Sequence, residues 1–263
     1  AGGGIGGSSG AAVGFDPATG KRLFVVGNES DSVLAVDISP DNSRIVLGGP
    51  SKVAKVFATA DGREIHAFRK PTDWVTACSF SPDGLLVAAG DRFGGLTLWE
   101  TKTGKEFLSL KGHTKGIVGL GWRADGDRIA SASADGTVRV WNLHTGETAA
   151  SWDAHADGAL ALDWHARGGI ATTGRDSRVR LWSEDGKPSA DLGTTPDQSF
   201  HVAFAADGKS VVVGDWAGNV QVRTAASDKP LSLAMPIDPV AAAKVAFASV
   251  PVRQAPKPVS YTH

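Results

Sequence analysis

Short apolar segments separated by turns run through most of the chain. Residues 116–152 show the pattern most clearly, because apolar positions there gather into short runs or alternate with polar ones. The runs are 117–122, 128–133, 137–141 and 147–152. Gly and Asp stand between them, as in the turn at Ala124, Asp125 and Gly126, where Gly allows positive φ and Asp bonds nearby backbone amides. No segment keeps helical periodicity, so the pattern predicts four short strands joined by tight turns.

This four-strand pattern repeats along the chain. The aromatic residues that end the third strands recur every 41–42 residues, at Phe15, Phe57, Trp99, Trp141 and Trp182. A turn glycine recurs with nearly the same period, at Gly20, Gly62, Gly104, Gly146 and Gly186. A repeat of about 42 residues with four strands is typical of a β-propeller blade, in which neighbouring blades pack through their apolar faces.

The repeat also divides the chain into units. Five are complete, at 32–68, 74–110, 116–152, 158–193 and 199–235, and residues 1–28 form a partial unit. We therefore predict an all-β propeller over 1–235, with five complete four-stranded blades and one partial blade, in a ring of six or seven in the full protein. Residues 236–263 are expected to be an extension, with a possible closing strand at 243–252 and a disordered tail.

Two units carry a recognisable combination of polar residues. Gly112-His113 is followed by Asp135 and then by Trp141-Asn142, and the next unit has Ala154-His155, Asp176 and Trp182-Ser183. This pattern resembles the WD-repeat β-propeller family. The resemblance implies two hydrogen-bonded tetrads, formed by His113, Ser131, Asp135 and Trp141, and by His155, Thr172, Asp176 and Trp182. Such tetrads lock a blade when every member is bonded.

The remaining units depart from this pattern. The counterparts of Asp135 are Ser51, Phe93 and Ala217, and Arg223 replaces the aromatic residue that ends the third strand. We expect these blades to be held by packing alone.

Composition narrows the range of functions. The formal net charge of −1 argues against nucleic-acid binding, which needs clustered Lys and Arg. The single cysteine excludes an intramolecular disulfide framework and a cysteine-rich zinc site, and no apolar stretch reaches the ~18 residues of a membrane span. Because the chain begins at Ala1, we expect it to be part of a longer protein.

No catalytic, metal or cofactor motif is convincing. Residues 2–7 match G-x-G-x-x-G as letters, but a strand is expected to follow them where a dinucleotide site needs a helix. The seven histidines lack zinc-protease spacing, and no G-x-S-x-G elbow occurs. We therefore expect no enzyme activity, no metal and no cofactor.

Two tryptophans stand apart from the blade positions. Trp74 precedes a first strand and Trp216 lies in a turn between second and third strands, on the face that the family resemblance implies contacts partners. Packing against a neighbouring blade is the alternative role for both. The loop positions comparable to them are Arg92, Phe93, Lys115, Asp157, Arg175 and Gln198. The predicted function is a non-catalytic scaffold that binds a protein or peptide, with assembly into a larger complex possible.

Two other functions stay open. The Asp-Gly-Lys and Thr-Gly-Lys turns resemble those of bacterial WD-repeat proteins, whose propellers often adjoin kinase or cytochrome modules. The chain could then be an accessory domain of a larger enzyme, kinase or electron-transfer protein, with a ligand at the channel mouth. A purely structural spacer or assembly domain is the third reading, and the sequence assigns no cellular compartment.

Overall fold

The computed structural model describes residues 1–16, 18–165, 169–225 and 227–233. By contacts, the chain divides into two compact units, Ala1–Leu233 and Ala234–His263. The extension predicted at 236–263, with its closing strand at 243–252 and its tail, lies outside the described residues. The account below concerns the first unit.

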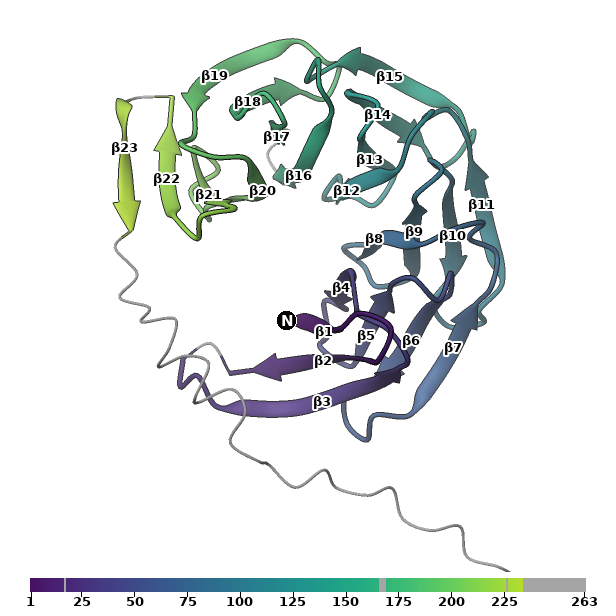
Figure 1. The fold of residues 1–263 in the computed structure, drawn as a ribbon. Coiled ribbons are helices and arrows are strands. Elements are labelled where there is room, and N and C mark those ends of the chain that lie inside the picture. Colours follow the sequence, from purple (N-terminus) through teal and green to yellow (C-terminus); the bar gives the residue numbers. More distant parts are fainter. Residues whose placement is uncertain (17, 166–168, 226, 234–263) are drawn as a thin grey trace, which may run out of the picture. The chain divides into compact units, whose positions relative to one another are not determined.

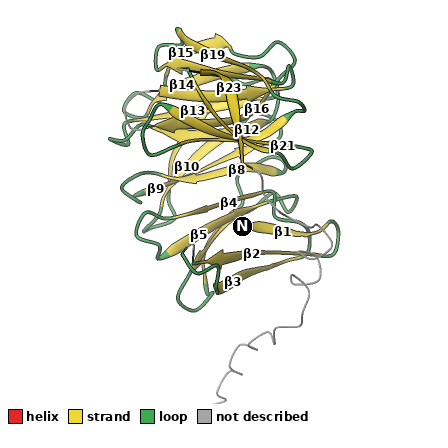
Figure 2. Ribbon diagram, turned by 90° about the vertical axis from the view of Figure 1, so that its left-hand side faces the viewer, coloured by secondary structure: helices red, strands yellow, loops and turns green. Residues whose placement is uncertain are grey.

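The described elements of this unit are β-strands joined by loops (Figure 2). An N-terminal sheet of three antiparallel strands comes first. Its strands are β1 (Gly2–Ile5), β2 (Ser9–Phe15) and β3 (Arg22–Glu29). The glycine-rich start of the chain thus forms a hairpin and leads into a strand, which does not fit a dinucleotide-binding turn.

Five four-stranded antiparallel sheets follow, and their strands lie in chain order across each sheet (Figure 1). The first comprises β4 (Ala35–Ile38), β5 (Arg44–Gly48), β6 (Ala54–Ala58) and β7 (Glu64–Phe68). The second comprises β8 (Val75–Phe80), β9 (Leu86–Asp91), β10 (Leu96–Glu100) and β11 (Glu106–Leu110). The third comprises β12 (Ile117–Trp122), β13 (Arg128–Ser133), β14 (Thr137–Asn142) and β15 (Thr148–Asp153). The fourth comprises β16 (Ala159–His165), β17 (Gly169–Gly174), β18 (Arg178–Ser183) and β19 (Pro188–Thr194). The fifth comprises β20 (Ser199–Phe204), β21 (Ser210–Asp215), β22 (Val220–Thr224) and β23 (Ser227–Leu233).

The first strands of consecutive sheets lie next to one another, β4 by β8, β8 by β12, β12 by β16 and β16 by β20. Each sheet is therefore one blade of a propeller, with its first strand innermost. The predicted all-β fold, with five complete blades and one partial blade at the N-terminus, is confirmed. The blades are named below by their first and last strands.

The hydrophobic core is divided among the spaces between blades. Leu96 and Leu98 of β10, for example, belong to one buried cluster with Ile117, Ile129 and Trp141 of the next blade. The second strands β9, β13 and β17 are buried along nearly their whole length and are rich in small residues, whereas the outermost strands β11 and β15 are largely exposed. Each blade therefore buries both faces of its inner strands against its neighbours, and its loops are held on a rigid frame.

Among the described residues, no helix is long and apolar enough to cross a membrane.

Candidate partner-binding face

The β12–β15 blade contains a buried chain of hydrogen bonds between four residues named from the sequence. The Trp141 indole N–H donates to the Ser131 hydroxyl oxygen at 2.9 Å, and that hydroxyl lies 2.8 Å from His113 Nε2. Because the Ser131 oxygen already accepts from Trp141, its own hydrogen is available to His113 Nε2. The other ring nitrogen, His113 Nδ1, then carries a proton and donates to Asp135 Oδ2 at 3.1 Å.

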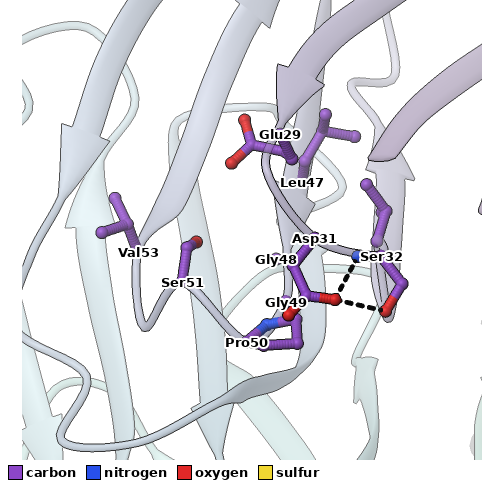
Figure 3. A pocket seen from close by; sticks show the side chains of 10 residues that line it. Glu29, Asp31, Ser32, Leu47, Gly48, Gly49, Pro50, Ser51 and Val53 are labelled. Carbon is purple, nitrogen blue, oxygen red and sulfur yellow. Dashed lines mark hydrogen bonds between the residues drawn. The ribbon is translucent and has the colours of Figure 1, made fainter. Parts of the chain in front are cut away.

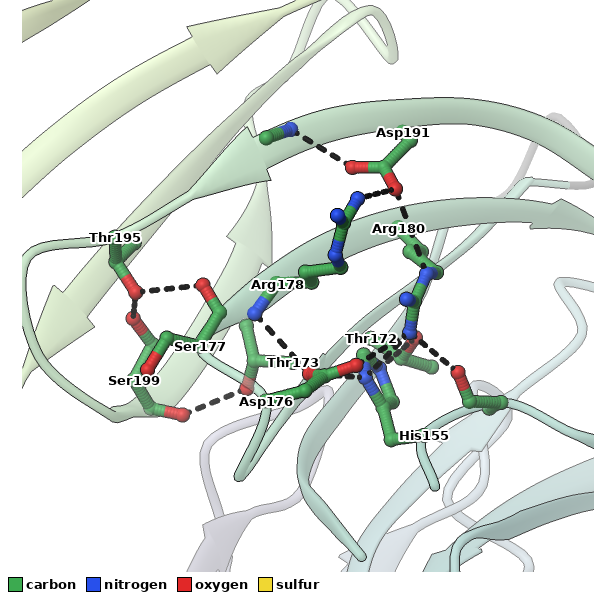
Figure 4. Close-up of polar contacts among 12 residues, drawn as sticks. His155, Thr172, Thr173, Asp176, Ser177, Arg178, Arg180, Asp191, Thr195 and Ser199 are labelled. Atoms are coloured by element: carbon green, nitrogen blue, oxygen red, sulfur yellow. Dashed lines mark hydrogen bonds and ion pairs between the residues drawn. The ribbon is translucent and has the colours of Figure 1, made fainter. Parts of the chain in front are cut away.

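The same network recurs in the β16–β19 blade, and Figure 4 shows the part formed by His155, Thr172 and Asp176. Trp182 donates to the Thr172 hydroxyl at 2.8 Å, Thr172 lies 2.9 Å from His155 Nε2, and His155 Nδ1 lies 2.8 Å from Asp176. Arg180 adds a charged contact of 2.8 Å to the second oxygen of Asp176. Every polar side-chain group in this hydrogen-bonded network has a partner. That is the condition under which a buried network stabilises a fold.

Burial and hydrogen bonding set the charges in these networks. Burial lowers the pKa of both His113 and His155, and it outweighs the attraction of the adjacent aspartates. Burial alone would raise the pKa of Asp135, but hydrogen bonds from Thr114 and Thr137 lower it to about 2. Each network therefore holds a neutral histidine beside an ionised aspartate.

The blades without this pattern are not held by packing alone, and that expectation was wrong. In the β8–β11 blade, the buried Asp91 accepts hydrogen bonds from the backbone of Phe93 and Gly95, each at 2.9 Å. Its second oxygen accepts from the Thr72 backbone and hydroxyl, each at 3.0 Å. Asp91 thus binds the turn that Asp135 binds in the next blade, from a position two residues earlier in the repeat.

The β20–β23 blade uses the same substitute. Asp215, at the end of β21, accepts hydrogen bonds from the backbone and side-chain nitrogens of Asn219 at 2.8 and 2.9 Å. Arg223 is buried, and its guanidinium donates to the carbonyl oxygens of Leu192 and Thr194 on β19, each at 2.6 Å. Arg223 therefore ties this blade to the preceding one through hydrogen bonds.

The eight loop residues predicted to bind partners lie on loops at one end of the blades. These loops either enter a first strand or join a second strand to a third, and backbone hydrogen bonds connect them in pairs. Arg92 N–H donates to the Trp74 carbonyl, Arg175 N–H to Gly158, next to Asp157, and Trp216 N–H to Gln198, each at 2.9 Å. Within each of these blades, the structure brings the predicted residues together.

The loops around the β8–β11 blade form the most compact group. The Arg92 guanidinium lies 4.8 Å from the centre of the Trp74 ring, within cation–π distance. Phe93 is 67% exposed and Trp74 39% exposed. The Lys115 loop packs against this turn, because a Cβ built on Gly94 would lie 2.8 Å from the Lys115 carbonyl oxygen.

A second aromatic pair lies on the β20–β23 blade. Trp216 is 77% exposed, and its ring centre is 5.5 Å from that of Phe200, which is 48% exposed. Phe200 was missed from the sequence because it falls inside an apolar strand. It is the extra residue of a β-bulge between Ser199 and His201, and bulges re-aim side chains.

Comparison with known proteins agrees with this geometry. The family model described as "WD domain, G-beta repeat" matches residues 62–95, 104–142 and 146–183. These three segments are WD repeats, and the blades that they form belong to a β-propeller. No curated protein matches it. The solved structure of U3-55K has a TM-score of 0.71 and 23% sequence identity, covering 75% of this chain and 62% of that one. The chain therefore spans less than two thirds of U3-55K, and the likeness at this identity is one of fold.

Each WD repeat straddles two blades. The match at 104–142 begins with β11, the outermost strand of one blade, and ends with β14, the third strand of the next. The match at 146–183 runs in the same way from β15 to β18. A repeat of this kind therefore ties neighbouring blades together covalently.

The polar groups of the described residues do not gather in the way that a metal site needs. Those residues contain no group of three or more His, Cys, Asp or Glu that could hold a metal ion. A pocket between the N-terminal sheet and the β4–β7 blade has a free volume of about 10 Å³, enough for about one water molecule (Figure 3). Asp31, which lines it, is hydrogen-bonded to Ser32 and Gly7.

Proposed function

We propose that this chain is a non-catalytic scaffold that binds a protein or peptide through the loop face carrying Trp74, Phe93 and Trp216. One observation carries the proposal. Large aromatic side chains stand exposed on turns whose backbones are fixed to the loop beside them. Trp and Tyr are enriched at binding hot spots.

Rigidity of the face supports this function. Because Arg92 and Trp216 donate backbone hydrogen bonds to the neighbouring loops, their turns lose little further entropy when a partner binds. The blades fix the loops, and the loop side chains supply the specificity. The near-zero net charge favours a protein or peptide over nucleic acid as the general class of partner.

The test is affinity capture from native lysate with the full chain and two sets of variants. The first set replaces Trp74 and Trp216 by Ala, singly and together. The matched control is Leu85→Ala, because Leu85 is as exposed as Phe93, at 67%, but lies in the β8–β9 turn at the opposite end of the same blade.

The proposal expects the double variant to recover at least about fivefold less of the captured partner, while Leu85→Ala recovers the wild-type amount. Thermal unfolding of each variant shows whether it is folded. Equal recovery by the folded double variant and the wild type would contradict a partner surface at this face.

A further inference from the structure

The β8–β11 blade has a groove at its loop end. Its volume is about 400 Å³, which falls in the range of small-ligand sites. Thr72 and Phe93 line it from the loops, Thr97 from β10, Ser109 from β11, and Lys111 from the loop that leaves β11.

The groove lies beside Thr97, whose side chain is short compared with those at the equivalent positions of the other blades. The third strand of every four-stranded blade has an equivalent position, defined by its pairing with the second strand. The residues there are Lys55, Thr97, Arg139, Arg180 and Gln221. Thr97 is the only short one among these five. Arg139 and Arg180 extend over the loop end of their own blades, where Arg180 reaches Asp176 and Arg139 approaches the Trp141 ring. Thr97 cannot fill the corresponding space in the β8–β11 blade.

Lys70 and Lys111 line this groove, and Arg92 and Lys115 lie on the loops that adjoin its lining. Arg92, Lys111 and Lys115 are exposed, and none of them forms an ion pair with a described carboxylate. The nearby acidic groups are already engaged: Asp73 pairs with Lys52, Glu106 pairs with Lys70, and the buried Asp91 accepts four hydrogen bonds. The donors to Asp91 are neutral groups and cancel no charge, so three cations without an ion pair stand against one buried carboxylate. The balance at the groove is therefore cationic, although the net charge of the whole chain is close to zero.

The rim offers a rigid apolar contact beside these cations. Phe93 stands exposed on a turn that Asp91 fixes from below. Gly94 has a φ of 88°, and a Cβ there would lie 2.7 Å from the His113 carbonyl oxygen, so the turn is packed closely against the next loop. An extended peptide could place an apolar side chain against Phe93 and its carboxylates near Lys111 and Arg92.

We propose that this groove binds an acidic peptide segment of the partner, with an apolar residue seated against Phe93 and flanking carboxylates paired with Lys111, Lys115 and Arg92. The assignment rests on the proposed scaffold function and adds the chemistry of the ligand to it. Basic side chains on the rim would act mainly on the association rate and on the choice of partner.

The probe is a short fluorescein-labelled peptide in which glutamates flank a leucine, titrated with the full chain by fluorescence anisotropy. The comparison peptide carries lysines in place of the glutamates, and a short single-stranded RNA represents the other anionic class. The proposal expects the glutamate peptide to bind at least about tenfold more tightly than the lysine peptide. Its affinity should fall as salt is raised, because exposed charges are screened.

Variants locate the site. Thr97→Gln fills the groove with the residue type found at Gln221 and adds no charge, while Thr97→Ser leaves the groove open. Phe93→Ala removes the apolar contact, and Leu85→Ala is the exposed control on the same blade. We expect Thr97→Gln and Phe93→Ala each to weaken binding of the glutamate peptide at least about fivefold, with Leu85→Ala unchanged. Thr97→Ser should bind the peptide more tightly than Thr97→Gln, because it does not fill the groove. Unfolding curves establish that each variant is folded.

Four results would overturn the assignment: no binding of the glutamate peptide, equal binding of the lysine peptide, unchanged binding by Thr97→Gln and Phe93→Ala, or preferential binding of the RNA. If the peptide assay fails while Trp74 and Trp216 still govern capture from lysate, only the acidic-peptide assignment is wrong. If both assays fail, the loop face is not a binding surface.

Discussion

The β8–β11 and β12–β15 blades share their strand order but differ in what occupies their loop ends. In the β12–β15 blade, His113, Ser131, Asp135 and Trp141 form a continuous buried network, and Arg139 lies over the Trp141 ring. The β8–β11 blade has Asp91 and Thr97 instead, with a groove beside Thr97 and Phe93 exposed at its rim.

The difference separates two tasks that a blade can perform. Both blades bind their turn through an aspartate, so both hold their loops rigidly. The network blade also fills its loop end with His113 and Arg139. The β8–β11 blade keeps the aspartate, lacks the filling side chains, and so has room for a ligand. Under the proposed function, neighbouring blades of one propeller would then serve stability and binding separately.

The largest predicted effect comes from removing the centre of the network. Trp141→Ala should lower the free energy of unfolding by about 3–5 kcal/mol, because it leaves a cavity and takes the donor from Ser131. Denaturant unfolding measures this loss. Trp216→Ala, at an exposed tryptophan, should cost less than about 0.5 kcal/mol.

Conservative variants sharpen the comparison between the two blades. Ala89 occupies the place of Ser131 in the β8–β11 blade, and Trp99 there stacks on Phe68 at 4.5 Å between ring centres. Trp141→Phe should therefore lower the free energy of unfolding by about 1 kcal/mol more than Trp99→Phe does. The reason is that Trp141→Phe removes the hydrogen bond to the Ser131 hydroxyl, whereas Ala89 has no hydroxyl that could accept such a bond from Trp99. Equal costs would mean that the network adds nothing to packing.

We predict a smaller effect from the two buried histidines, which should make the free energy of unfolding depend on pH. Burial lowers the pKa of His113 and His155 below the ordinary value of 6.5, so both are neutral in the folded protein. Below pH 6.5 the unfolded chain binds protons that the folded one does not, and stability falls as the pH falls. Above pH 6.5 their contribution is fully present. Each histidine contributes at most about 1.4 kcal/mol per pH unit.

Unfolding curves between pH 7.5 and 5 measure this dependence. Replacing His113 and His155 by Gln should reduce its slope, even if the variants are less stable at every pH. His144→Gln is the control, because that side chain is largely exposed and lies outside both networks. An unchanged slope in the His113 and His155 variants would show that other groups cause the acid sensitivity.

The sequence predicted the fold well because the period of 41–42 residues repeats at several independent positions, and each repeat must bury its faces against the next. The loop pairs were also predictable, since Trp74 and Trp216 break the repeat of buried aromatics. Asp91 was not, because it performs the turn-binding role from a shifted position where the repeat has Ser133 or Gly174.

The groove could not be predicted from the sequence either. It depends on the length of a single side chain, Thr97, compared with its equivalents across five blades, and on three cations left without carboxylates. Ion pairing decides which charges remain available, because Lys70 pairs with Glu106 and Lys52 pairs with Asp73. Such pairing is a property of the folded surface.

The most direct test of the scaffold function places a photo-crosslinking amino acid at Phe93 in one sample and at Leu85 in another. The two positions are equally exposed and lie at opposite ends of one blade. After irradiation in native lysate, mass spectrometry identifies the attached proteins. The account predicts a specific adduct from position 93 that is absent from position 85 and is lost in the Trp74 and Trp216 double variant. The same adducts from both positions, or none from position 93, would contradict a binding surface at the loop face.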